Sequence, residues 1–129
     1  MTIVRHRSGS PWEVPYGYCR AVRCGDWIEV AGTVAVDADG AVVAPGDAGE
    51  QARVALARIA SALEQAGARM DQVVRTRVFV VDIVADAEAI GLAHGEAFGG
   101  APPVTTMVQV AALIDPALLV EIEARAYVV

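Results

Sequence analysis

Hydrophobic and polar residues alternate in several parts of the chain, which is the pattern of a strand with one buried face. The alternation is clearest over residues 119–128, where Val120 and Ile122 point one way and Glu121 points the other. Gly and Pro residues separate these parts as turns do, and residues 37–40 are predicted to form a hairpin turn. Strands are therefore predicted at residues 20–36, 41–43, 73–83, 104–110 and 119–128.

Two other segments carry apolar residues at spacings of three and four, which is the pattern of a helix with one buried face. They span residues 48–66, with Asp47 as the expected N-cap and Gly67 as the expected C-cap, and residues 86–98. The predicted order of elements is β-β-(β)-α-β-α-β-β. We therefore expect residues 1–129 to form a single α+β domain, a two-layer sandwich with two helices on one face of a mixed β-sheet. The other face would stay open, which favours self-association.

Composition narrows the classes of partner. The chain of 129 residues has a formal net charge of −6, and its ten strongly basic residues are all Arg. An acidic chain without basic clusters is poorly suited to nucleic acid or an anionic membrane surface, so neither partner is expected. No apolar stretch approaches the roughly 20 residues of a spanning helix, and no signal peptide is visible, which predicts a cytoplasmic protein. Cys19 and Cys24 lack the spacing of metal ligands, so no metal site is expected.

The order of several short segments is more specific than any one of them. They are GYCRAV at residues 17–22, VAGT at 30–33, the run from 51 to 68, VRTRVFV at 74–80, and residues 103–124 with LVEIEA at their end. In this order the chain resembles the RidA/YjgF family, small homotrimeric proteins with a chorismate-mutase-like fold, some of which hydrolyse reactive enamines and imines. The resemblance implies a homotrimer that binds a small-molecule ligand in clefts between subunits and uses no cofactor.

Three matching positions are candidates for the site. The resemblance implies that Glu121 is the catalytic residue that positions the attacking water, that Tyr18 lines the cleft, and that the backbone approaches the ligand at Gly32. A carboxylate beside an imine can accept a proton from water and return it to the leaving nitrogen. Two alternatives stay open. Tyr16 competes with Tyr18, and Glu121 fits equally well in a polar row that faces solvent or another subunit.

One position departs from the family's pattern. In deaminating members an Arg two residues after a proline binds the substrate carboxylate, but here Thr105 stands at that place and Met107 fills a second position. Thr105, Thr106 and Met107 are still expected to line the substrate site. A threonine hydroxyl offers one neutral hydrogen bond in place of a bidentate grip. Binding of acids such as 2-iminopropionate should therefore weaken by roughly 1.5–3 kcal/mol per lost charge-assisted bond. The arginines that could replace it, if their side chains point into the cleft, are Arg20, Arg75 and Arg77.

Two functional hypotheses follow from these observations. The first is a cofactor-free hydrolase or deaminase of small imine or enamine-type metabolites, with a substrate range altered by Thr105 and weak or absent activity on 2-iminoalkanoates. The second is a non-catalytic homotrimer that uses the same clefts to bind a metabolite or another protein. Under the first hypothesis Glu121 would be the acid–base or water-orienting group, and Tyr18 and Thr105 would orient the substrate.

Overall fold

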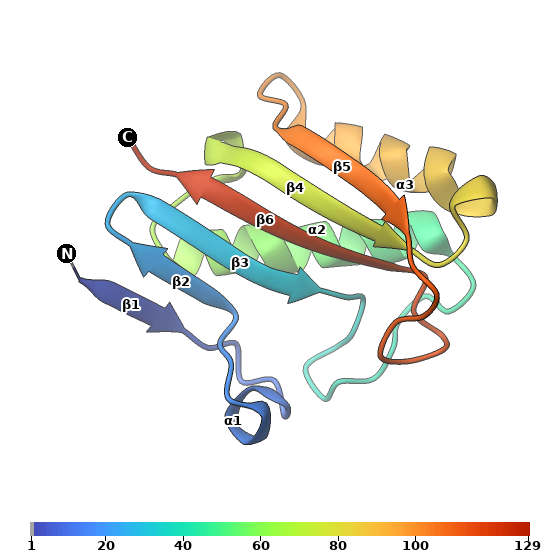
Figure 1. Ribbon diagram of the computed structural model, residues 1–129, viewed down its shortest axis with the longest axis horizontal. Helices are drawn as coiled ribbons and strands as arrows, with labels where there is room; N and C mark the ends of the chain where they lie inside the picture. Colours follow the sequence, from blue (N-terminus) through green and yellow to red (C-terminus); the bar gives the residue numbers. More distant parts are fainter. Residues whose placement is uncertain (1) are drawn as a thin grey trace.

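The computed structural model of the protein describes residues 2–129. Its strands are β1 (Ile3–His6), β2 (Ala21–Cys24), β3 (Trp27–Thr33), β4 (Val73–Val80), β5 (Val104–Gln109) and β6 (Val120–Tyr127). Its helices are α1 (Glu13–Tyr16), α2 (Ala48–Gln65), α3 (Ile83–Phe98) and the 3-10 turn η1 (Met70–Gln72). The six strands form one sheet in the order β1-β2-β3-β6-β4-β5 (Figure 1).

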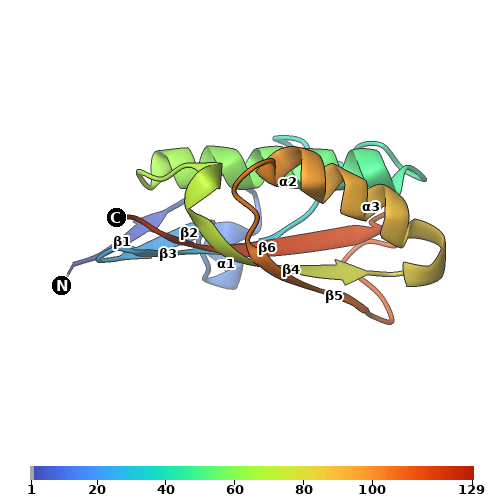
Figure 2. The same ribbon diagram turned by 90° about the horizontal axis from the view of Figure 1, so that it is seen from above.

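The sheet and the two long helices form two layers. All neighbouring strands are antiparallel except β4 and β5, so the sheet is mixed. The parallel pair is connected through α3, because parallel neighbours need a crossover rather than a hairpin. Both α2 and α3 lie on one face of the sheet (Figure 2). This is the α+β sandwich that the element order predicted, and no helix of residues 2–129 covers the other face of the sheet.

The core lies between the helices and the sheet and is built largely from small side chains. In β6 every second residue is buried, beginning with Val120 and Ile122, while the residues between them are only partly buried. The matching stripe of α2 consists of Ala52, Ala55, Leu56, Ile59, Ala62 and Leu63. The predicted alternation in the last strand is therefore confirmed, and Glu121 lies on the sheet face that the helices leave open.

The first long helix begins where the sequence predicted. The Asp47 carboxylate accepts a hydrogen bond from the Glu50 amide at 3.0 Å, which satisfies a donor that the first turn of a helix leaves unpaired. The helix ends one residue earlier than predicted, because Ala66 is the C-cap and Gly67 follows it with a positive φ of 90°.

The second long helix begins three residues earlier than predicted, at Ile83 instead of residue 86. Asp82 causes the early start, because its carboxylate accepts a hydrogen bond from the Ala85 amide at 3.1 Å and caps the first turn. The sequence pattern concealed this cap. Valine and isoleucine continue to Val84, so the strand signal extends into the helix.

The N-terminal third differs more from its prediction. The strand pattern predicted over residues 20–36 is a hairpin of β2 and β3 that turns at Gly25 with a φ of 61°. The predicted turn at residues 37–40 is present, but the strand expected at 41–43 is only an isolated bridge between Val36 and Val42. The sequence did not predict β1, whose first three residues are exposed, because such an edge strand has no buried face to mark it.

The short helix α1 was also missed, and it is held in place by a buried carboxylate. Glu13 is only 1% exposed, and its side chain accepts hydrogen bonds from the Ser8 amide, at 3.0 Å, and from the Ser8 hydroxyl. These bonds close the loop between residues 8 and 13, and the segment that they fix supplies Ser10, Trp12 and Tyr16 to the lining of a cavity beside β3 and β6.

Candidate functional site

A cavity of about 350 Å³ lies between the N-terminal segment, the end of β3 and β6. Its lining includes the aromatic residues Trp12, Tyr16 and Tyr18, the charged residues Arg20, Arg58 and Glu121, and Gly32. The structure thus brings together three residues that the sequence placed in the site: Tyr18, Gly32 and Glu121. Tyr16 lines the same cavity, so the two tyrosines are not mutually exclusive.

Glu121 is the only carboxylate that lines this cavity among residues 2–129. It lies on β6, where the neighbouring positions Val120 and Ile122 face the core. Burial raises the pKa of its carboxyl above the usual range, repulsion from Glu123 raises it further, and the charge of Arg20 opposes these two effects. A carboxyl with a raised pKa exchanges protons closer to neutral pH than an ordinary glutamate does, which suits acid–base chemistry.

Gly32 allows the Glu121 carboxylate to lie directly against β3. A Cβ atom at position 32 would come within 2.7 Å of Oε2 of Glu121, closer than side chains approach one another. The register of β3 against β6 is irregular between Val30 and Thr33, so the strand is distorted at this point. Glycine at this position therefore leaves the space that the carboxylate occupies.

Arg20 links the same stretch of β3 to the cavity. Its Nη1 donates to the Gly32 carbonyl oxygen at 2.8 Å and to Thr33 Oγ1 at 3.2 Å, and its guanidinium carbon lies 5.7 Å from the centre of the Tyr18 ring. The side chain is 6% exposed, and its Nε is buried without a hydrogen-bond partner in residues 2–129. Of the three arginines proposed to replace the missing family Arg, Arg20 alone lines the cavity.

Arg58 is a site residue that the sequence analysis missed. It extends from α2, and its Nη1 donates to the Val34 carbonyl oxygen at 2.6 Å. Burial lowers the pKa of its guanidinium, and the nearby charge of Arg20 lowers it further. The helical pattern assigned this side chain to the polar face. Arg58 lies three residues after Ala55 and four before Ala62, so it is on the helix surface beside the buried stripe. This spacing was the sequence feature that could have indicated a partly buried side chain.

Comparison with known proteins establishes the family. A family model described as endoribonuclease L-PSP matches residues 12–128. A crystal structure from Mycobacterium tuberculosis, described as a member of the YjgF/YER057c/UK114 family, is 48% identical and superposes with a TM-score of 0.88, covering 98% of this chain and 100% of that one. The protein belongs to the RidA/YjgF family. Its fold is accordingly the one that the resemblance implied.

Relatives found by sequence agree with this assignment. A Streptomyces coelicolor protein of uncharacterised function is 42% identical over 125 residues, which cover 97% of this chain and 92% of the relative. A RutC family protein from Pyrococcus abyssi is 33% identical over 110 residues, 85% of each chain. Family membership thus extends over nearly the whole chain of this RidA/YjgF protein.

The three residues of β5 that the sequence predicted in the substrate site lie elsewhere in the protomer. Thr105, Thr106 and Met107 are on β5, which is separated from β6 by β4, and none of them lines the Glu121 cavity. Thr105 pairs with Thr76, and the two hydroxyl oxygens are 2.7 Å apart. Thr106 points to the opposite face, while Met107 packs against the core. A single protomer therefore does not bring these three residues to Glu121.

The Thr105 hydroxyl belongs to a small polar cluster under α3. Oγ1 of Thr76, which is fully buried, also lies 2.8 Å from Nε2 of His94. Burial lowers the pKa of the His94 imidazole, which favours its neutral form. The cluster satisfies the Thr76 hydroxyl in the core, so these contacts give Thr105 a structural role within the protomer.

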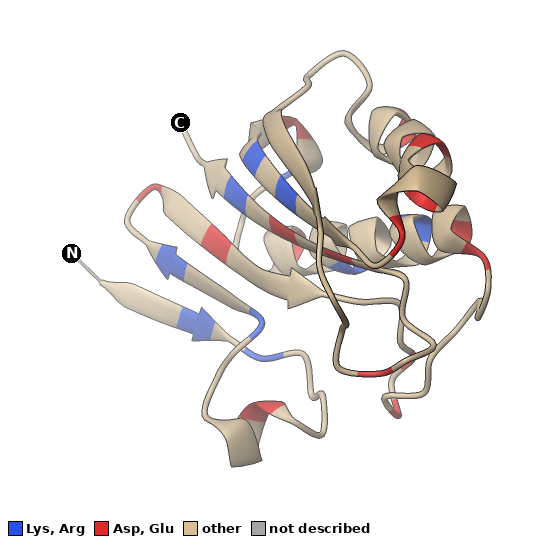
Figure 3. Ribbon diagram, turned by 45° about the vertical axis from the view of Figure 1, so that its right-hand side comes forward, with Lys and Arg blue, Asp and Glu red and all other residues tan. Residues whose placement is uncertain are grey.

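Four other charged residues of the open face form two ion pairs. Arg77 Nη1 lies 3.0 Å from Oε1 of Glu123, and Arg125 pairs with Glu29. Figure 3 shows these basic and acidic positions side by side on β3, β4 and β6. These four side chains line a small polar recess together with Arg75. Arg75 does not line the Glu121 cavity. Glu121 forms no ion pair within residues 2–129, which sets it apart from the polar row on its own strand.

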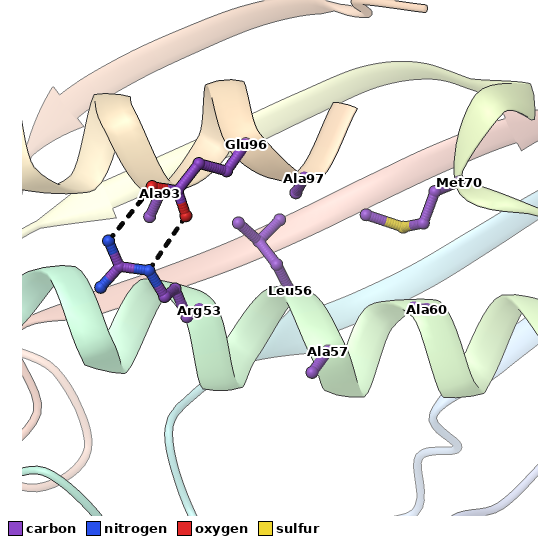
Figure 4. A pocket seen from close by; sticks show the side chains of 8 residues that line it. All are labelled: Arg53, Leu56, Ala57, Ala60, Met70, Ala93, Glu96 and Ala97. Atoms are coloured by element: carbon purple, nitrogen blue, oxygen red, sulfur yellow. Dashed lines mark hydrogen bonds and ion pairs between the residues drawn. The ribbon is translucent and has the colours of Figure 1, made fainter. Parts of the chain in front are cut away.

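A second cavity, of about 280 Å³, lies between α2 and α3 on the far side of the helix layer (Figure 4). Half of its lining residues are alanines, Leu56 and Met70 also line it, and the ion pair of Arg53 with Glu96, at 3.1 Å, completes the lining. The two charges neutralise each other and are largely exposed, so they contribute little to stability. No set of unpaired polar groups points into this cavity, and we assign no chemistry to it.

Two wider features bear on ligand class. Within residues 2–129, no three His, Cys, Asp or Glu side chains are grouped closely enough to hold a metal ion. In the same part of the chain, no helix is long and apolar enough to cross a membrane. The Glu121 cavity presents one carboxylate, two guanidinium groups and aromatic rings to a ligand.

Proposed function

We propose that the protein is a cofactor-free hydrolase of small imine or enamine-type metabolites, with Glu121 as its catalytic residue. The observation that carries the proposal is the position of Glu121: a half-buried carboxylate without an ion pair, set against Gly32 in a cavity with aromatic walls. Its raised pKa supports a role in proton transfer. Membership of the RidA/YjgF family supports the same reaction class.

The proposed reaction needs only water and one proton-transferring group. The Glu121 carboxylate accepts a proton from a water molecule while the water oxygen attacks the carbon of the C=N bond. The tetrahedral adduct then receives this proton on nitrogen from Glu121. The carboxylate next takes the proton of the hydroxyl group and passes it to the same nitrogen, so that the C–N bond breaks, ammonia departs and the carbonyl forms. Atoms and charge balance, since one imine and one water give one carbonyl compound and one ammonia. Tyr18 would orient the substrate, and Gly32 would allow its close approach to β3.

We propose that the working form is a homotrimer in which Thr105, Thr106 and Met107 of a neighbouring subunit complete each cleft. The open sheet face supports association, because it exposes large apolar side chains that a monomer would leave in water. Trp27, Val104 and Val108 are 46%, 59% and 42% exposed. The predicted roles of the three β5 residues depend on this assembly, since they lie away from Glu121 in one protomer.

A small molecule fits the site better than RNA does, although the family model carries the description of an endoribonuclease. A formal net charge of −6 repels a phosphate backbone. On the open face Arg77 and Arg125 are engaged with Glu123 and Glu29, so they do not form a free basic surface. We therefore propose a small-molecule ligand rather than a nucleic acid.

An imine-trapping assay tests the proposed function. An amine oxidase generates imines that lack a carboxylate, an amino-acid oxidase generates imines that carry one, and semicarbazide traps whatever remains unhydrolysed. Addition of the protein should lower the yield of semicarbazone for at least one of the two imine classes. An unchanged yield with both classes would contradict the proposal. Cleavage of a single-stranded RNA by the same preparation would support the ribonuclease description instead.

A further inference from the structure

We propose that Arg20 and Arg58 form a carboxylate-binding subsite inside the Glu121 cavity. The inference rests on the proposed function, because it names the class of molecule that this cavity takes. That class is a small carboxylate that carries an apolar or aromatic group. The subsite would supply from within the protomer the guanidinium contact that Thr105 cannot make.

The guanidinium groups of Arg20 and Arg58 donate hydrogen bonds to neutral acceptors, and some of their N–H groups form no such bond. Arg20 uses Nη1 for the Gly32 carbonyl and the Thr33 hydroxyl, while Arg58 uses Nη1 for the Val34 carbonyl at 2.6 Å. Each guanidinium has five N–H donors, so these bonds leave several of them available. The Nε of Arg20 is buried and has no hydrogen-bond partner within residues 2–129, which is costly for a charged side chain.

The charges around the two arginines leave them without a neutralising partner. Neither one forms an ion pair within residues 2–129. The two carboxylates that act on them are Glu121, which forms no ion pair within residues 2–129, and Glu13, which is buried and already accepts two hydrogen bonds from Ser8. Two cations that repel each other in a half-buried site favour a bound anion, and a carboxylate matches the planar guanidinium geometry.

The subsite is adjacent to the proposed reacting group. Glu121 presses its carboxylate against Gly32, and Arg20 bonds the carbonyl oxygen of the same residue. A carboxylate held by Arg20 and Arg58 would therefore lie beside Glu121. The remainder of the molecule would contact Trp12, Tyr16 and Ile114, which line the same cavity and offer an apolar surface. This arrangement accounts for the class proposed: an anionic group at the arginines and an apolar group at the aromatic wall.

A binding measurement with an unreactive pair of probes tests the subsite. The probes are 3-phenylpropionate and its neutral amide, titrated calorimetrically into the full-length protein. We expect the acid to bind about tenfold or more tightly than the amide, as a charge-assisted bond implies. Arg58→Gln should bring the acid to the affinity of the amide, and Arg58→Lys should retain part of the preference. Equal affinities of acid and amide for the unaltered protein would overturn the proposal.

Arg7 provides the matched control. It lines a neighbouring cavity of about 330 Å³ that Arg20 and Arg58 also border, but it does not line the Glu121 cavity. Arg7→Ala should leave the preference for the acid unchanged. If Arg7→Ala abolishes the preference and Arg58→Gln does not, the anion binds in the neighbouring cavity and the proposal is wrong. Unfolding midpoints close to that of the unaltered protein would show that the variants are folded.

The binding result is separable from catalysis, because the probes contain no C=N bond. Retained, Arg58-dependent binding of the acid without any imine hydrolysis would contradict the proposed function and support the subsite. If the protein hydrolyses imines at a rate that depends neither on a carboxylate in the substrate nor on Arg58→Gln, the proposed function is supported and the subsite is contradicted.

Discussion

At the scale of single residues, some members of the candidate site could be predicted from the sequence and others could not. Glu121, Tyr18 and Gly32 were predicted from short matching segments, and the fold brings them to one cavity. Arg58 was not predicted. Its position beside the buried stripe of α2 was a local signal, but only the fold shows that this side of α2 borders the cavity. The sequence offered Arg20, Arg75 and Arg77 as equal candidates for binding a carboxylate. Only the folded sheet shows that Arg20 lines the Glu121 cavity while the other two line a different recess.

Gly32→Ala tests whether Glu121 needs the space at β3. The added Cβ would lie 2.7 Å from Oε2 of Glu121 and displace the carboxylate. We expect imine hydrolysis to fall about tenfold or more. Stability should change by about 1 kcal/mol or less, because the clash is with the end of a flexible side chain. Activity and thermal unfolding measure the two effects. Gly91→Ala, in an open position on α3, is the control and should preserve activity.

The raised pKa of Glu121 predicts a specific pH dependence. Hydrolysis requires the ionised carboxylate, so kcat/KM should fall as pH decreases through a pKa above that of an ordinary glutamate. Glu123→Gln removes a repelling charge and should shift this acidic limb to lower pH. If kcat/KM falls in the pH range of an ordinary glutamate, and Glu123→Gln does not shift that fall, Glu121 is not the titrating group.

The same shift has a consequence for stability. A carboxyl whose pKa is raised by folding stabilises the fold while protonated, and this contribution is lost as pH rises through the folded-state pKa. The glutamine side chain stays neutral at every pH. The free energy of unfolding of Glu121→Gln, relative to that of the unaltered protein, should therefore increase as pH rises from acidic to neutral. Urea unfolding of both proteins at several pH values measures this. A gain that does not depend on pH would argue against the shift.

At the scale of elements, the sequence predicted those with a clear buried face and missed those without one. The alternation of β6 and the apolar stripe of α2 reflect burial on one side, so both were predicted nearly to the residue. The edge strand β1 and the four-residue α1 bury almost no apolar surface and leave no such pattern. Helix α3 was predicted to begin too late, since a capping aspartate within a valine-rich stretch looks like part of a strand.

The cap of α3 can be tested by substitution. Asp82→Ala removes the acceptor for the Ala85 amide and should lower the free energy of unfolding by about 1 kcal/mol. Chemical denaturation measures the change. Asp86→Ala, at an acidic position in the same first turn that does not cap it, is the matched control and should cost less. Equal losses would assign the effect to charge near the helix terminus and not to the cap.

At the scale of the whole molecule, the two sheet faces have different roles. Helices α2 and α3 cover one face of the sheet (Figure 2), and this face holds the core. The open face carries the ion pairs, the exposed apolar residues of β5 and the Glu121 side chain. The family's fold could be predicted because its segments occur in a fixed order along the chain. The composition of a complete cleft could not, because Thr105, Thr106 and Met107 lie away from Glu121 within one protomer.

Assembly is tested by placing a charge on the open face. Val108→Asp, on β5, should dissociate the proposed trimer, because an unpaired carboxylate is costly to bury in an interface. Light scattering coupled to size-exclusion chromatography measures the mass. Val84→Asp, at a residue of α3 that is 93% exposed, should leave the trimer intact. A protein that is monomeric before substitution would contradict the proposed assembly.

The most direct test of the account compares imine hydrolysis by Glu121→Gln and Glu123→Gln under the trapping assay. The two substitutions remove the same charge from the same strand face two residues apart, but only Glu121 lines the cavity. We predict that Glu121→Gln lowers kcat/KM about a hundredfold or more, while Glu123→Gln retains activity. Equal activity of the two variants would contradict the assignment of catalysis to Glu121.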